Sequence, residues 1–115
     1  MKKFNKEKFI KKVNKIYQLE DELKNLRSNL QDMHNEIDVE SKILANNQTK
    51  YNELIDTPIK EIKNYSDFQF EELEELMDTL KSSPKKIEKL KNKKAKVFRK
   101  YQAIQNKIHK LRNSR

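Results

Sequence analysis

Apolar side chains recur along this chain at alternating steps of three and four residues. In the first half the positions are Ile16, Leu19, Leu23, Leu26, Leu30, Met33, Ile37, Glu40, Leu44, Asn47, Tyr51 and Leu54, and all except Glu40 and Asn47 are apolar. A 3.5-residue repeat that persists over so many turns is typical of a coiled-coil seam. We therefore predict one long helix over about residues 5–56.

The second half of the chain carries the same repeat. Its seam positions are Leu73, Leu76, Leu80, Ile87, Leu90, Lys94, Val97, Tyr101, Ile104, Ile108 and Leu111. They predict a second helix over about residues 67–113. Between the halves, Thr57-Pro58 and Ser66-Asp67 are typical of a helix end and a new helix start, so a turn is expected at about 57–66. The predicted fold class is all-α: a long antiparallel two-helix hairpin, coiled-coil-like, with residues 1–115 in a single elongated domain.

The two seams also share an alignment. If the chain reverses in the turn, seam residues whose numbers sum to 123 or 124 face each other, for example Ile16 with Ile108, Leu19 with Ile104, Leu26 with Val97 and Leu44 with Leu80. Independent heptad runs need not agree in this way, which favours an intramolecular hairpin. Glu40 falls opposite Ser83-Pro84, where a serine cap followed by proline predicts a kink or break in the second arm.

Several large apolar residues fall outside the seam. The main ones are Val13, Tyr17, Val39, Ile43, Ile59, Ile62, Phe68, Met77 and Phe98. Scattered exposed apolar residues are ordinary on protein surfaces. The alternative, which we favour, is a second apolar stripe that packs against another helical protein or a copy of this chain, as in a four-helix assembly.

Charge is distributed unevenly along the chain, whose net charge is +9. Residues 1–15 hold seven lysines and one glutamate, and residues 85–115 hold thirteen lysines or arginines and one glutamate. Residues 16–84 hold seven basic and sixteen acidic residues. In a hairpin both basic segments belong to the open end and the acidic residues crowd the turn.

The basic end permits a second hypothesis, binding to nucleic acid or another polyanion. Lys89, Lys93, Lys96 and Lys100 are spaced to form one stripe on a helix, and such a stripe neutralises phosphates. No helix-turn-helix, zinc-finger or aromatic stacking motif accompanies it. Any such binding is therefore expected to be independent of base sequence, as in an accessory protein or a phage-type inhibitor of a nucleic-acid machine.

Composition argues against an enzyme. The chain has no glycine, so it cannot form a P-loop, a dinucleotide fingerprint or a nucleophile elbow, and it has no cysteine. His34 and His109 fall on different arms, and no carboxylate cluster contains a histidine at metal-ligand spacing. We expect no cofactor, no metal and no small-molecule substrate. The short apolar runs predict no membrane span, and a cytoplasmic location is expected.

Two near-equal helical arms resemble the Trp-Xaa-Gly helical-hairpin proteins of type VII secretion, and the small helical partner subunits of Leu-Xaa-Gly toxins. The resemblance covers the whole chain and rests on architecture. Those families commonly carry a Trp-Xaa-Gly turn and a C-terminal signal in which an aromatic residue is followed four positions later by an acidic one. Tryptophan and glycine are absent here, and the residues four positions after Phe98 and Tyr101 are Gln102 and Gln105. The resemblance implies an adaptor that packs against a toxin and leaves the cell by a leaderless route. A structural coiled-coil scaffold is a third hypothesis.

Overall fold

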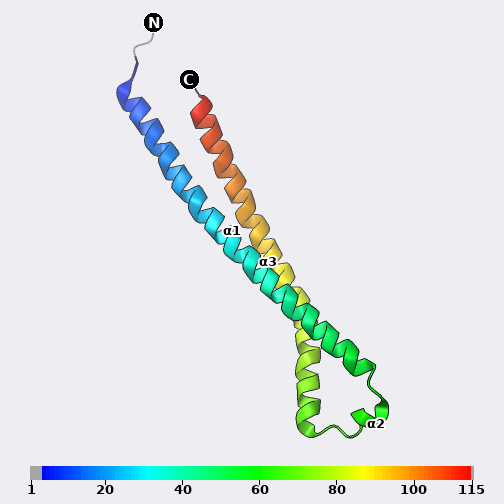
Figure 1. The fold of residues 1–115 in the computed structure, drawn as a ribbon. Coiled ribbons are helices and arrows are strands. Elements are labelled where there is room, and N and C mark those ends of the chain that lie inside the picture. Colours follow the sequence, from blue (N-terminus) through cyan, green and yellow to red (C-terminus); the bar gives the residue numbers. More distant parts are fainter. Residues whose placement is uncertain (1–3, 115) are drawn as a thin grey trace. The chain divides into compact units, whose positions relative to one another are not determined.

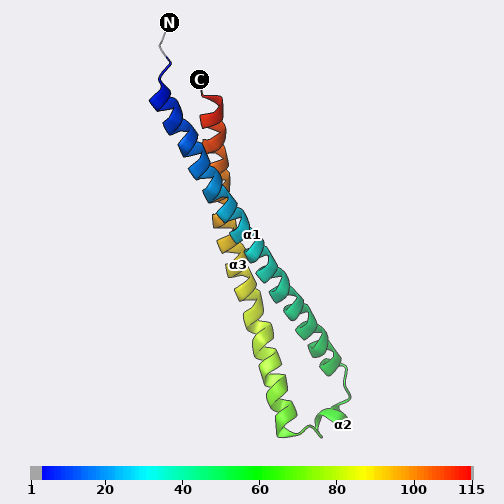
Figure 2. The ribbon, with the colours of Figure 1, turned by 60° about the vertical axis from the view of Figure 1, so that its left-hand side comes forward.

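The described part of the chain, residues 4–114, folds into two long α-helices and one short one. The computed structural model describes residues 4–114, in the order α1 (Lys6–Ile55, 50 residues), α2 (Ile59–Ile62, 4 residues) and α3 (Asp67–Asn113, 47 residues). The described residues include no strand. The fold is an antiparallel helical hairpin, with α2 in the segment that links the two arms (Figures 1 and 2).

Side-chain caps fix where the long helices begin. At the start of α1, the Lys8 backbone N–H donates to Asn5 Oδ1 at 3.1 Å. At the start of α3, the Gln69 N–H donates to Ser66 Oγ at 3.3 Å and the Ser66 N–H donates to Gln69 Oε1 at 2.8 Å. This reciprocal pair is a capping box, which satisfies two N–H groups that a helix start leaves without partners. The predicted cap at Ser66 is confirmed.

The molecule contains two compact units, each built from one stretch of α1 and one of α3. The terminal unit comprises Met1–Met33 and Lys93–Arg115, and the turn unit comprises His34–Asn92. The core of the terminal unit is Leu19, Ile104 and Ile108, with exposed fractions of 4%, 5% and 8%. The turn unit buries Ile87 (8%) and Ser83 (5%). Each unit is therefore held by a thin line of apolar contacts between two helices.

The predicted seam is the surface that the helices bury. Every seam position from Ile16 to Leu54 and from Leu73 to Leu111 is buried or half-buried, including the polar positions Glu40, Asn47 and Lys94. In the terminal unit, Ile16, Leu23, Leu26 and Leu111 pack against the cluster of Leu19, Ile104 and Ile108. The 3.5-residue repeat thus predicted the contact faces of both arms.

The alignment of the arms differs from the predicted one by a few residues. Glu40 was expected opposite Ser83 but pairs with Lys86. Leu26 was expected opposite Val97, but its neighbour Arg27 donates to the Tyr101 hydroxyl at 3.2 Å. Such a displacement leaves the same residues buried, because each seam repeats every three to four residues. The heptad pattern therefore predicts which helix faces meet more reliably than it predicts which residues lie opposite each other.

Of the kink or break predicted near Pro84, a break is not present, because α3 continues through the proline. Ser83 is buried within the helix, where it occupies the seam position between Leu80 and Ile87. Proline has no N–H, so the carbonyl of Leu80 receives no helical hydrogen bond from position 84. The seam stays in phase on both sides of the proline, which lets one continuous helix bury both halves. The ribbon of α3 changes direction in its yellow-green part, within the turn unit (Figure 1).

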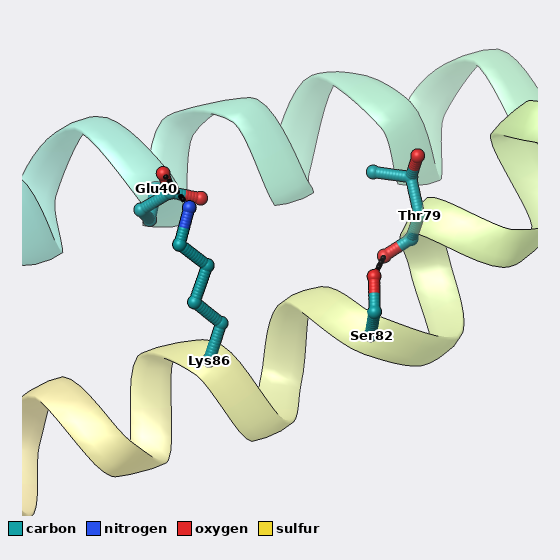
Figure 3. Close-up of polar contacts among 4 residues, drawn as sticks. All are labelled: Glu40, Thr79, Ser82 and Lys86. Carbon is teal, nitrogen blue, oxygen red and sulfur yellow. Dashed lines mark hydrogen bonds and ion pairs between the residues drawn. The ribbon is translucent and has the colours of Figure 1, made fainter.

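The charged seam position Glu40 is neutralised across the turn unit. Its Oε1 accepts a hydrogen bond from Lys86 Nζ at 2.8 Å, and the two groups form an ion pair (Figure 3). The Glu40 side chain is only 18% exposed, whereas that of Lys86 is 59% exposed. The lysine thus brings its charge to a carboxylate that the seam partly removes from water.

This ion pair predicts a pH effect at Lys86. The hydrogen bond to Glu40 is the largest cause that raises the pKa of the Lys86 ammonium above its usual value of 10.5, followed by Coulombic attraction to the same carboxylate. A raised folded-state pKa means that the pair stabilises the fold below pH 10.5 and that this contribution is lost as pH rises through the raised pKa. We expect an NMR titration of the lysine side chains to show a raised pKa for Lys86 that falls in the Glu40→Gln variant. Equal values in both proteins would contradict the pairing.

Candidate interaction surfaces

The apolar residues predicted to lie outside the seam are mostly exposed. Val13 and Ile62 are half-buried. The other seven have these exposed fractions: Tyr17 62%, Val39 54%, Ile43 42%, Ile59 70%, Phe68 67%, Met77 39% and Phe98 46%. Apolar side chains that the hairpin leaves in water are available to a partner.

These side chains form local groups on each helix. In the turn unit, Val39 and Ile43 lie four residues apart on α1 and share one face, because residues at that spacing are neighbours on a helix. On α3, Phe70 and Met77 lie seven residues apart and share another face, with exposed fractions of 44% and 39%. The turn unit therefore presents exposed apolar side chains on both of its long helices.

Sequence reasoning missed three exposed phenylalanines. Phe4 and Phe9 are 75% and 51% exposed and their ring centroids lie 5.5 Å apart. Phe70 lies edge-on to Tyr65, with centroids 5.8 Å apart. A signal for Phe9 was present, because it stands seven residues before Ile16 and so continues the seam backwards. The many lysines around it obscured that continuation.

The four lysines of the predicted basic stripe are exposed, with Lys89 in the turn unit and the other three in the terminal unit. No ion pair joins any of them to a carboxylate within residues 4–114. Residues 93–113 of α3 contain eight lysines or arginines and no acidic residue. This stretch of α3 therefore has a strongly positive potential that its own side chains do not neutralise.

The turn unit contains a cleft of about 620 Å³ between the last turns of α1 and the first turns of α3. Half-buried Leu54, Tyr65, Leu73 and Leu76 contribute apolar surface to it. Exposed carboxylates also line it, from Glu53, Glu72 and Glu75. The cleft is thus mostly polar, with four apolar side chains, three carboxylates and the single cation Lys50 in its lining, and the sequence did not predict it.

Comparisons with known proteins give no match. No protein-family model, no curated protein and no solved structure matches this chain.

The described residues show no site for a metal ion. Within residues 4–114, no group of three or more His, Cys, Asp or Glu side chains is placed to hold one. His109 contacts the Asn113 side-chain amide on its own helix, at 3.0 Å from Nε2. None of the described helices is long and apolar enough to cross a membrane. The features that distinguish this surface are therefore its apolar groups, its basic stretch and the cleft.

Proposed function

We propose that this chain is a non-enzymatic helical partner protein, which packs its exposed apolar side chains against another helical protein or a second copy. The observation that supports this proposal most is the exposure of large apolar residues on both long helices, among them Val39, Ile43 and Phe98. A two-helix seam buries only one side of each helix, and a third or fourth helix is the usual way to cover the rest. The partner thus contributes packing that the hairpin lacks.

The more specific proposal is a partner subunit for an exported helical toxin, acting in the cytoplasm and leaving the cell with its cargo. Its support is the architectural resemblance to the hairpin proteins of type VII secretion. Packing against a helical toxin segment uses the same exposed groups as any other helical partner. This form of the proposal is tested by isolating the chain from its native host with its bound protein and sequencing that protein.

The general proposal predicts the effect of removing exposed apolar groups. We expect the triple variant Val39→Ser, Ile43→Ser, Phe98→Ser to stay helical and to lose association about tenfold or more, because buried apolar anchors dominate interface energies. Co-purification from the native host measures association with a helical partner. The triple variant Asn35→Ser, Gln48→Ser, Gln102→Ser changes exposed polar residues and serves as the control. Unchanged association of the apolar variant would contradict the proposal.

A second candidate function is sequence-independent binding of a polyanion by the basic stretch of α3. The observation in its favour is the set of exposed lysines without carboxylate partners, Lys89, Lys93, Lys96 and Lys100. Each phosphate contact releases counterions, so affinity falls steeply with salt. Changing the four lysines to glutamine should weaken binding to duplex DNA of any sequence and make the slope of log affinity against log salt shallower, by about 0.9 for each phosphate that is no longer neutralised. No binding by the wild-type chain at low salt would eliminate this candidate.

A further inference from the structure

We propose that the cleft of the turn unit binds the first helical turns of a second copy of this chain, residues 4–17, so that copies associate head to tail. The proposal rests on the function proposed above and specifies one partner and the two surfaces that meet. Its basis is a match between a cleft whose lining combines apolar side chains with three glutamates and one lysine, and an apolar helical segment with many lysines.

The cleft offers apolar side chains that a third helix could cover. It lies between the last turns of α1 and the first turns of α3, in the part of the turn unit where the two helices stand apart (Figures 1 and 2). Leu54, Leu73 and Leu76 are seam residues, yet they line this open volume instead of closing on one another. The heptad repeat therefore supplies apolar side chains here that the hairpin itself does not fully cover. A third helix laid along the cleft would bury them.

The segment at residues 4–17 has the form of such a helix. Phe9, Ile10 and Tyr17 have exposed fractions of 51%, 47% and 62%. With half-buried Val13 they recur at i, i+1, i+4 and i+8, which places them within about 100° on a helix of 3.6 residues per turn. Phe4 packs on Phe9 and extends this apolar face towards the start of α1. The segment thus presents an amphipathic helix with three apolar side chains exposed to water, while Val13 is partly buried.

The charges favour contact between a cleft and a segment over contact between two clefts or between two segments. Residues 47–80 contain nine carboxylates and three lysines, a balance of −6, while residues 4–15 contain five lysines and one glutamate, a balance of +4. Two clefts would repel each other, and so would two such segments. Opposite charges attract the segment of one copy to the cleft of another and orient it during encounter. The attraction should weaken with salt because the charged groups are exposed.

The contact is heterologous, because each copy contributes a different surface. Such an assembly has an unused cleft at one end and an unused segment at the other. Further copies can therefore add until the assembly closes into a ring. We therefore expect average mass to rise steadily with concentration, without a plateau at two chains. Raising sodium chloride to about 0.5 M should weaken the association between copies about tenfold, because salt screens the ionic contacts.

Two variants separate the two surfaces. The segment variant carries Phe9→Ser and Ile10→Ser, and the cleft variant carries Glu72→Lys and Glu75→Lys. All four side chains are exposed, so circular dichroism should show unchanged helix content. The matched controls are Asn25→Ser with Asn29→Ser, which introduces two serines at exposed positions outside both surfaces, and Asp21→Lys with Asp32→Lys, which makes the same charge change outside the cleft.

The test measures the mass of the full-length proteins by sedimentation equilibrium, alone and mixed. We expect each variant alone to be monomeric and their equimolar mixture to form a complex of two chains and no more, because one intact cleft meets one intact segment. Both controls should associate like the wild type. A mixture that stays monomeric while the wild type associates would overturn the proposal, as would variants that associate like the wild type.

Two further outcomes distinguish this proposal from the general one. If Phe98→Ser abolishes association and the segment variant does not, the head-to-tail contact is wrong while the partner function stands. If the wild type is monomeric at every concentration but a host protein protects Glu72 and Glu75 from chemical modification, the cleft belongs to that protein and not to a second copy. A wild-type chain that associates with neither a copy nor a host protein would contradict both proposals.

Discussion

Replacing Leu19 with alanine is expected to lower the free energy of unfolding by about 2–4 kcal/mol, the usual cost of truncating a buried leucine. Leu19 is the most deeply buried apolar residue described and sits in one cluster with Ile104 and Ile108. Removing its branched end leaves a cavity that a thin two-helix core has few neighbouring side chains to fill. Urea unfolding followed by far-ultraviolet circular dichroism measures the change.

The control for this prediction is Tyr17→Ala, two residues earlier on the same helix. Tyr17 is 62% exposed, so its replacement should change the free energy of unfolding by only about 0.5 kcal/mol. The comparison separates burial at the seam from the helix propensity of this part of α1. Equal losses in the two variants would mean that Leu19 does not hold the arms together.

Replacing Pro84 with alanine is expected to stabilise the protein by about 2 kcal/mol. Proline within a helix costs about 3 kcal/mol relative to alanine, and part of the gain is offset because proline also restricts the unfolded chain. Alanine restores the N–H that the carbonyl of Leu80 otherwise lacks. Thermal and urea unfolding should both show the increase.

The Pro84 variant also distinguishes two local structures. If a new helix began at Ser83-Pro84, proline would stand at the first helical position, where it is well tolerated, and alanine would give no gain. The structure instead has one helix through this site. Ala95→Pro, in the interior of α3, supplies the opposite control, with an expected loss of about 3 kcal/mol. A Pro84→Ala variant that is neutral or less stable would contradict the continuous helix.

The sequence predicted the seam well because helix periodicity depends only on local spacing. Positions such as Leu19 and Ile104 were assigned to the core from their place in a 3.5-residue repeat, and both are buried. The helix start at Ser66 was predictable for the same reason, since a capping box involves residues three apart. Signals of this kind need no knowledge of distant contacts.

The features that the sequence did not give depend on how the two helices meet. Pro84 carries a local signal for a break, but an in-phase seam on both sides outweighs it. The pairing of Glu40 with Lys86 depends on a displacement of a few residues that the apolar repeat barely distinguishes. The cleft arises because half-buried Leu54 and Leu73 line an open volume where the helices stand apart, whereas periodicity alone predicts closed packing at every seam position.

The most direct test of the hairpin is a disulfide between its arms. The chain has no native cysteine, so Leu19→Cys with Ile108→Cys forms the only possible pair. A disulfide requires Cα atoms about 4.4–6.8 Å apart, which holds only if these residues face each other. Mild oxidation of dilute protein should link the two positions within one chain, seen as a faster-migrating monomer on non-reducing gels, while Leu19→Cys with Val97→Cys should remain largely reduced. Crosslinks found only between chains, or equal crosslinking of both pairs, would contradict the hairpin.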